Sequence, residues 1–307
     1  MGRSFAEFIE HCLKSAEALE PIPTDCPERL TALPGVRAVL FDVYGTVLIS
    51  SSGDIDVSDY ALDNVVHALR MSGCDAPAGR ERDVAGFVIA EFLLTIRRHH
   101  ESGRAEGKPQ PEVDILAVWR DVMRVLNERG TLDEPPAVEI EKLAFAFEMC
   151  SNPVYPMPGF AETIGALDRR NLVLGIVSNA QFFTPVIMNY FLSGSVSDEA
   201  TVPPFRPDLT FFSYRYGRAK PDPFLFDAAK DGLARLGIEP GNVLFVGNDM
   251  RNDIWPARQA GFRTALFAGD RRSLRLRKDD PRAADAGPDC VLHDLRHLET
   301  IVAEAGH

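Results

Sequence analysis

The stretch Leu-Phe-Asp-Val-Tyr-Gly-Thr, residues 40–46, places one aspartate, Asp42, between an apolar run and a Gly-Thr turn. A carboxylate in such a turn can act as a nucleophile that forms a covalent intermediate, or it can bind a hard cation. Thr46 follows in the same turn and can donate a hydrogen bond to an anion. Tyr44, between them, is a poor acid at neutral pH, because a phenol has a reference pKa of about 10. The stretch therefore points to chemistry on an anionic substrate, centred on Asp42.

Further polar side chains stand just after apolar runs or just before a helical pattern. They are Ser178 and Asn179, Lys220 in "GRAKPDP", and Asn248, Asp249 and Asp253. Hydroxyl, amide and lysine donors can hold the three outer oxygens of a transferring phosphoryl group. Carboxylate oxygens, together with phosphate oxygens, are ligands that Mg²⁺ prefers. The sequence therefore carries the residue types that phosphate chemistry requires.

Short apolar runs predict the strands that would position these residues. Three of the runs, 36–43, 172–179 and 242–249, end in the polar residues named above, and 263–268 and 290–294 could be two more strands. Helical patterns at 159–170, 223–237 and 253–261 separate the later runs. This alternation predicts an α/β fold with a Rossmann-like, doubly wound parallel sheet. Ligands bind at the carboxyl ends of such strands, where the polar residues lie.

The segment 53–152 has a different pattern of apolar residues. It contains four amphipathic stretches and no convincing strand, so we expect an inserted bundle of helices. The α/β core would then consist of 35–52 and 153–307. Residues 1–34 form an N-terminal extension whose apolar positions recur at helical spacing. We expect this helix to cover its own chain, although a homodimer through this helix or the inserted bundle stays open.

Composition narrows the classes of partner. The chain has 307 residues and a formal net charge of −12, which argues against nucleic acid and anionic membranes as partners. No apolar run is long enough to span a bilayer, and acidic residues interrupt the N-terminus, so we expect a cytoplasmic protein that acts on a small molecule. The five cysteines lack metal spacing and are expected to be reduced thiols. The basic run 270–278 is interpreted as an exposed loop.

Four stretches resemble, in order, the motifs of the haloacid dehalogenase-like (HAD) superfamily of hydrolases. They read "FDVYGTV", "IVSN", "AKPDP" and "VGNDMRND". The resemblance implies that Asp42 is a catalytic nucleophile that forms an aspartyl-phosphate, and that Lys220 neutralises charge around it. The substrate's anionic group would be held by Thr46, Ser178 and Asn179. The helical insertion corresponds to the mobile cap of the family, which closes over the site.

The resemblance also implies a Mg²⁺ site. In metal-using members the ligands are the first aspartate, the backbone carbonyl two residues on and an acid of the fourth motif, which correspond to Asp42, Tyr44 and either Asp249 or Asp253. These two acids are four residues apart, so on a helix that begins near 250 they would share one face. Alignment to the family's commoner Gly-Asp form favours Asn248 as the first position of this motif. Chemistry favours Asp249, because an amide is a poorer Mg²⁺ ligand than a carboxylate.

Tyr44 bears on the choice between a phosphatase and a 2-haloacid dehalogenase. Most phosphatases of the superfamily carry at this position a second aspartate that protonates the leaving group, whereas the 2-haloacid dehalogenases carry tyrosine. Those dehalogenases are metal-independent, have Ser-Ser-Asn in the fourth motif, and have a tyrosine where this chain has Phe226. We therefore favour a Mg²⁺-dependent hydrolase of a small phosphorylated metabolite that lacks the usual acid. A metal-independent dehalogenase is the alternative, and a catalytically weak binding or scaffold protein is a further one.

Overall fold

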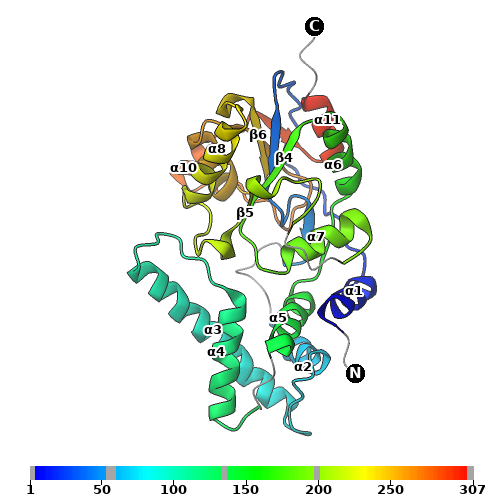
Figure 1. The fold of residues 1–307 in the computed structure, drawn as a ribbon, viewed down its shortest axis with the longest axis vertical. Helices are drawn as coiled ribbons and strands as arrows, with labels where there is room; N and C mark the ends of the chain where they lie inside the picture. The colour runs from blue at the N-terminus through cyan, green and yellow to red at the C-terminus, as the bar shows by residue number, and fades with distance from the viewer. Residues whose placement is uncertain (1–3, 53–59, 133–136, 197–200, 303–307) are drawn as a thin grey trace.

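A computed structural model describes residues 4–52, 60–132, 137–196 and 201–302 of the chain (Figure 1). Figure 1 shows a sheet flanked by helices and, at one end of it, a separate group of helices. The sheet has six parallel strands in the order β5-β4-β1-β6-β7-β8. Their bounds are β1 Ala38–Phe41, β4 Val173–Ser178, β5 Thr210–Phe212, β6 Val243–Gly247, β7 Arg263–Phe267 and β8 Cys290–Leu292. The predicted doubly wound α/β fold is therefore confirmed, with β5 as an additional edge strand.

Helices cover both faces of this sheet. Successive side chains of a strand point to opposite faces, and in β1 Val39 and Phe41 join one apolar cluster while Ala38 and Leu40 join another. Because both faces are covered, the central strands are continuous apolar runs. The first cluster includes residues of α6 and α11, and the second includes residues of α8 and α9. The helices of this part are α6 Phe160–Arg169, α7 Thr184–Ser193, α8 Phe224–Arg235, α9 Trp255–Gln259, α10 Pro281–Ala284 and α11 Leu298–Ile301.

A small antiparallel hairpin joins the sheet to the second group of helices. Strand β2, Leu48–Ser50, pairs with β3, Val154–Pro156. Between these strands lie the four helices that we call the cap helices: α2 Leu62–Met71, α3 Glu81–Ala105, α4 Ile115–Glu128 and α5 Ala137–Ser151. The Ser50 hydroxyl donates to Asn152 Oδ1 at 2.9 Å, which ties the two sides of the hairpin together. The cap helices therefore leave and return to the sheet at one place.

An aromatic cluster forms the core of the cap helices. The ring centroids of Phe92 and Trp119 are 4.9 Å apart, and Phe147 lies 4.8 Å from each of them. Helix α4, which carries Trp119, begins at an aspartate cap, because Asp114 accepts from the backbone N–H of Leu116. These contacts pack α3, α4 and α5 against one another.

The first helix, α1 (Phe5–Ser15), packs on its own chain. Ser4 and Glu7 form a capping box at its start. Its Phe8 ring lies 6.3 Å from Phe145 of α5, and its Phe5 ring stacks 6.0 Å from Phe182, in the loop that follows β4. Helix α1 thus contacts both the cap helices and the sheet-bearing part.

Two sequence expectations concern the whole chain. None of the helices in the described ranges is both long enough and apolar enough to cross a bilayer. Each of the five cysteines lies within the described residues and carries a thiol that is not joined in a disulfide, as predicted.

Candidate active site

The predicted polar residues meet at one edge of the sheet. Asp42 follows β1, Ser178 ends β4, and Asn248 follows β6. Strand β1 lies between β4 and β6, so the carboxyl ends of these three strands are neighbours. The parallel topology therefore gathers residues that are far apart in the chain.

Lys220 is the centre of this cluster. Its Nζ donates to Asp42 Oδ1 at 2.6 Å and to Asp253 Oδ1 at 2.5 Å, and all three side chains are buried. Burial by itself lowers the pKa of Lys220, but Asp253 and Asp42 outweigh it and the pKa is raised. The ammonium therefore stays charged at neutral pH and offsets the negative charge beside Asp42.

Asn179 positions the backbone of Lys220. The Oδ1 of Asn179 accepts from the Lys220 N–H at 2.7 Å, and its Nδ2 donates to the Lys220 carbonyl at 3.3 Å. The neighbouring Ser178 hydroxyl donates to the Asn179 carbonyl at 3.3 Å. In this arrangement Asn179 contacts Lys220, although the family resemblance assigned it to the substrate's anionic group.

Asp253 is anchored by the turn that follows β6. This turn is a π-helical segment, Met250–Ile254, and the Oδ2 of Asp253 accepts from the backbone N–H groups of Asn248 and Asp249 at 3.1 and 2.9 Å. The pKa of Asp253 is raised to about 7. Burial is the largest cause, Asp42 and Asp249 also raise the pKa, and Lys220 lowers it. The cluster thus holds more buried negative charge than Lys220 alone compensates.

Asp249 points to different partners. It caps the π-helical segment, because its Oδ1 accepts from the N–H groups of Arg251 and Asn252 at 2.8 and 3.1 Å. Its Oδ2 accepts from Arg277 Nη2 at 2.7 Å and from Arg277 Nε at 3.1 Å. Asp249 and Asp253 therefore pair with different cations, Arg277 and Lys220.

Arg277 belongs to the basic run 270–278, which was interpreted as an exposed loop. That interpretation is wrong for most of the run: Asp270 and Ser273 are each only 1% exposed, and the Arg277 side chain is 28% exposed. The loop packs against the turn after β6, where the backbone N–H of Arg275 donates to the carbonyl of Asn248 at 3.0 Å. The sequence alone did not identify Arg277 as a residue near the site. A basic run flanked by acidic residues has the same composition whether it lies on the surface or beside a site.

The turn after β1 is held by contacts with Asn248 and Thr184. Thr46 Oγ1 donates to Asn248 Oδ1 at 3.3 Å, and a Cβ added to Gly45 would lie only 2.4 Å from Asn248 Nδ2. The Tyr44 hydroxyl lies 2.8 Å from Thr184 Oγ1 at the start of α7. Burial raises the pKa of Tyr44 well above its usual range, and the Glu148 carboxylate raises it further. Tyr44 is therefore a still weaker acid here than in water.

The donor set can be tested for Mg²⁺. Asp42 and Asp253 share one buried ammonium while Asp249 is paired with Arg277, and the two carboxylates on a single Lys220 leave an excess of oxygen donors that suits a hard cation. The arrangement nevertheless keeps Asp249 on Arg277, and within the described ranges no three His, Cys, Asp or Glu side chains are grouped around a point that suits a metal ion. The residue types fit Mg²⁺, while Asp249 would have to exchange Arg277 for the ion.

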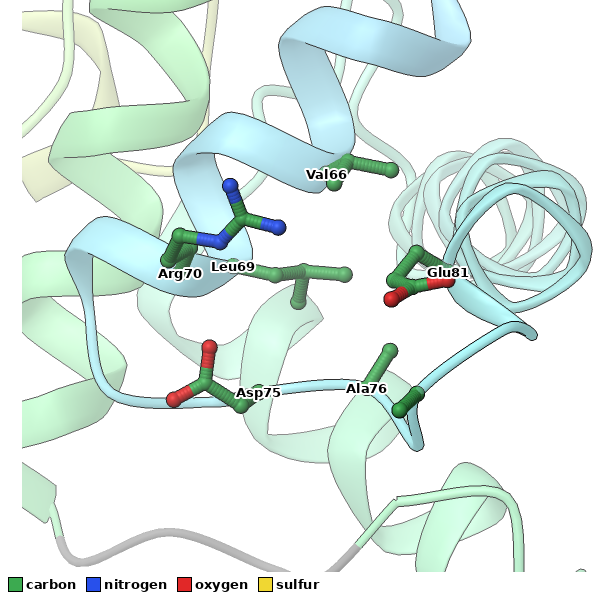
Figure 2. A pocket seen from close by; sticks show the side chains of 7 residues that line it. Val66, Leu69, Arg70, Asp75, Ala76 and Glu81 are labelled. Carbon is green, nitrogen blue, oxygen red and sulfur yellow. The ribbon is translucent and has the colours of Figure 1, made fainter.

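Two cavities lie outside this cluster. One, of about 260 Å³, lies among the cap helices between α2 and the start of α3, and Arg70, Asp75 and Glu81 are among the side chains that line it (Figure 2). The other, of about 480 Å³, adjoins Asp249 through Arg277 and is lined by Arg251, Arg277, Lys278, Asp279, Asp280, Pro281 and Arg282. Asp42 lines neither of these two cavities.

Comparisons with known proteins point to a family of hydrolases. A family model described as haloacid dehalogenase-like hydrolase matches residues 36–261. Phosphoglycolate phosphatase of Escherichia coli is 30% identical over 234 residues, which cover 74% of this chain and 79% of that protein. Phosphoglycolate phosphatase of Salmonella paratyphi A is 30% identical over 242 residues, which cover 76% of this chain and 81% of that protein.

Among solved structures, a 2-haloacid dehalogenase from Pseudomonas syringae is similar. Its TM-score is 0.53 at 20% sequence identity, and the match covers 87% of this chain and 97% of that chain. A likeness at this level of identity shows a shared fold and leaves the choice between phosphate and halide chemistry to the residues of the site.

Proposed function

Because the chain belongs to the haloacid dehalogenase-like hydrolases, we propose that it hydrolyses a small phosphorylated metabolite through an aspartyl-phosphate at Asp42. The observation that carries this proposal is the contact of 2.6 Å between Lys220 Nζ and Asp42 Oδ1. A charged ammonium at this distance lies directly beside the nucleophile and offsets negative charge when an anionic substrate arrives.

The proposed reaction has two steps. Lys220 occupies Oδ1 of Asp42, so we assign the attack on phosphorus to Oδ2; the new Asp42–phosphorus bond forms as the bond to the leaving oxygen breaks and that oxygen takes the electron pair. Water then attacks the phosphorus of the aspartyl-phosphate, releases inorganic phosphate and restores the carboxylate. Thr46 and Ser178 are the hydroxyl donors that we assign to the phosphoryl oxygens.

We propose Mg²⁺ as the cofactor. Asp42, the backbone carbonyl of Tyr44 and Asp249 would hold it, and the bound ion would supply positive charge next to the phosphoryl oxygens. Asp253 would instead keep its ion pair with Lys220 and its hydrogen bonds from the backbone N–H groups of Asn248 and Asp249. The excess of buried carboxylate described above supports this assignment.

A metal-independent 2-haloacid dehalogenase is the second candidate, and one observation favours it. Each of the three carboxylates contacts a protein cation, since Lys220 binds Asp42 and Asp253 while Arg277 binds Asp249. Against it, Phe226 stands where those dehalogenases carry tyrosine, and it is buried in the core with its ring 5.0 Å from Phe245. The relatives that match at 30% identity are named as phosphatases, so we place phosphate chemistry first.

The test is a comparison of three substrates with and without EDTA. Phosphate release would be measured from phosphoglycolate and from an activated aryl phosphate, and halide release from a 2-haloacid. We expect phosphate release that EDTA abolishes and that Asp42→Asn removes. Halide release that ignores EDTA, without phosphate release, would overturn the proposal. A scaffold protein would show neither activity, and Asp42→Asn would leave its partner binding intact.

Location and assembly stay predictions from the sequence. We propose a cytoplasmic location. A homodimer through α1 or the cap helices is a further prediction, which light scattering coupled to size-exclusion chromatography tests.

A further inference from the structure

The cap helices contact the sheet-bearing part through the loop between α3 and α4. We call residues 110–115, at the end of this loop and the start of α4, the docking segment. In Figure 1 the connection between α3 and α4 lies at the end of the cap helices that faces the sheet. The Ala219 N–H donates to the carbonyl of Gln110 at 2.8 Å, beside a second backbone bond that completes a short antiparallel ladder. The ladder ends one residue before Lys220, so the docking segment holds the backbone that leads into the site.

Gln181, in the loop that follows β4, binds the docking segment with both ends of its side-chain amide. Its Nε2 donates to the carbonyl of Val113 at 3.0 Å, and its Oε1 accepts from the N–H of Ile115 at 3.1 Å. Its backbone N–H donates to Thr184 Oγ1 at 3.2 Å, and this oxygen lies 2.8 Å from the Tyr44 hydroxyl. The loop after β4 therefore links the docking segment to the turn after β1.

Glu112 connects the docking segment to the same loop through a buried serine. Its Oε2 accepts from the Ser213 hydroxyl at 2.7 Å. The Ser213 side chain is completely buried, and its oxygen accepts in turn from the Ala180 N–H at 2.9 Å. The carbonyl of Ala180, 3.3 Å from this hydroxyl, is the alternative acceptor of its proton. A carboxylate can only accept, so Glu112 fixes the direction of the single hydroxyl proton and turns a lone pair to the Ala180 N–H.

These contacts reach Lys220 from two directions. Ala219, the residue before it, is bonded to the docking segment. Asn179, which precedes Ala180, binds the N–H and the carbonyl of Lys220 itself. The Lys220 ammonium is in turn the group that contacts Asp42. The contacts of the docking segment described above are hydrogen bonds, which water can replace when the segment leaves the sheet-bearing part.

We propose that the docked segment positions Lys220, with Glu112 and Gln181 as the positioning residues that couple the cap helices to it. This inference rests on the proposed function, because it concerns the rate at which Asp42 reacts. Without the docked segment, Ala219 loses its bond to the cap and the loop after β4 loses its partners there. The ammonium is then held less firmly beside Asp42, and the charge of an arriving phosphoryl group is offset less well.

Variants of the two positioning residues test this role on two substrates. Glu112→Ala removes the acceptor of the Ser213 proton, so kcat should fall by about 10–10²-fold. The fall should be equal for phosphoglycolate and for an activated aryl phosphate, because Lys220 contacts the nucleophile and its position does not depend on the leaving group. Glu112→Gln keeps an acceptor oxygen and should retain most of the rate. Gln181→Ala breaks the same docking from the side of the sheet and should match Glu112→Ala.

Hydrogen exchange measures the hold on Lys220 without turnover. In Glu112→Ala and Gln181→Ala, the backbone N–H groups of Ala219 and Lys220 should exchange faster than in the wild-type protein, because the bonds that protect them loosen. Exchange in strand β7, which the docking segment does not contact, should stay the same. Peptide mass spectrometry after exchange in heavy water follows both regions.

Glu106→Ala is the matched control, because Glu106 is an exposed glutamate of the same loop whose carboxylate pairs with Lys108 at 3.0 Å. It should change neither the rates nor the exchange, and thermal melting shows that each variant is folded at the assay temperature. Folded Glu112→Ala and Gln181→Ala proteins with wild-type rates, a larger loss on phosphoglycolate than on the aryl phosphate, or unchanged exchange at Lys220 would overturn the inference while the proposed function stands. Failure of the proposed function would show differently, as wild-type protein that releases no phosphate, and exchange at Lys220 would still decide whether the docking segment positions it.

Discussion

Lys220 and Asp42 are 178 positions apart in the chain, and their side chains form a buried ion pair of 2.6 Å. The same ammonium lies 2.5 Å from Asp253. Removing one partner of a buried pair leaves charge without compensation, which is far more damaging than removing a surface pair. The contact therefore links stability to catalysis at this site.

Lys220→Met should lose both stability and activity. Asp42 and Asp253 would be left buried beside an uncharged side chain, so the free energy of unfolding should fall by about 3–5 kcal/mol, as measured by urea denaturation. Phosphate release should fall below detection. Adding Asp253→Asn to this variant should restore part of the stability without restoring turnover.

Lys230→Met is the control for this prediction, because Lys230 is exposed on α8. It should change the free energy of unfolding by less than about 0.5 kcal/mol. Equal stability of the two variants would contradict the buried ion pair.

Gly45→Ala should disturb the turn after Asp42. Gly45 has a φ of +80°, and an added Cβ would lie 2.5 Å from Ser273 Cβ. Gly107, with a φ of +81°, has no atom within 4 Å of such a Cβ, so Gly107→Ala carries the same backbone strain without the clash. We expect Gly45→Ala to be less stable than Gly107→Ala by about 1–3 kcal/mol in parallel thermal melts, and Gly45→Ala alone to lose activity. Equal melting temperatures would show that the turn has room to relax.

Arg277→Gln should strengthen Mg²⁺ binding. The guanidinium holds Asp249 Oδ2 at 2.7 Å, and a divalent ion must displace it to use that oxygen. A partly exposed ion pair is typically worth about 0.2–1 kcal/mol, so the Kd for Mg²⁺ measured by titration calorimetry should fall by up to about fivefold. Arg282→Gln, on the same cavity but paired with Asp280, should leave the Kd unchanged. Weaker binding in Arg277→Gln would mean that Asp249 is not a ligand.

Cys150 should react slowly with alkylating reagents. Burial raises the pKa of its thiol from 9.0 to about 11, and the thiolate is the reactive form. The rate of labelling by iodoacetamide, followed by peptide mass spectrometry, should therefore keep rising up to about pH 11. The folded state favours the protonated thiol, so this group's contribution to stability falls as the pH rises from 9.0 towards 11. A plateau in labelling near pH 9 would contradict this burial.

The strands of the core could be predicted from the sequence because each is an apolar run that ends in a polar residue. The run 36–43 became β1 and placed Asp42 at the edge where Ser178 and Asn248 also lie. Strand β5 was missed, since its three residues, Thr-Phe-Phe, are too short to stand out from their surroundings. The apolar pattern was enough to predict a strand where the run was long and ended in a polar residue.

The partners of the site residues could not be predicted in the same way. Arg277 reaches Asp249 from a loop after β7. Arg277 belongs to none of the four motifs, and its position depends on how that loop packs against the turn after β6. The spacing of Asp249 and Asp253 likewise could not show that the turn after β6 is π-helical or that the two acids pair with different cations.

Helix α1 contacts two parts of the molecule, the cap helices and the sheet-bearing part. Its Phe8 lies against Phe145 of the cap helices, while its Phe5 stacks on Phe182 beside the sheet. Any movement of α5 away from the sheet-bearing part must break one of these two ring contacts. We infer that the segment before the first motif restrains the cap helices relative to the nucleophile.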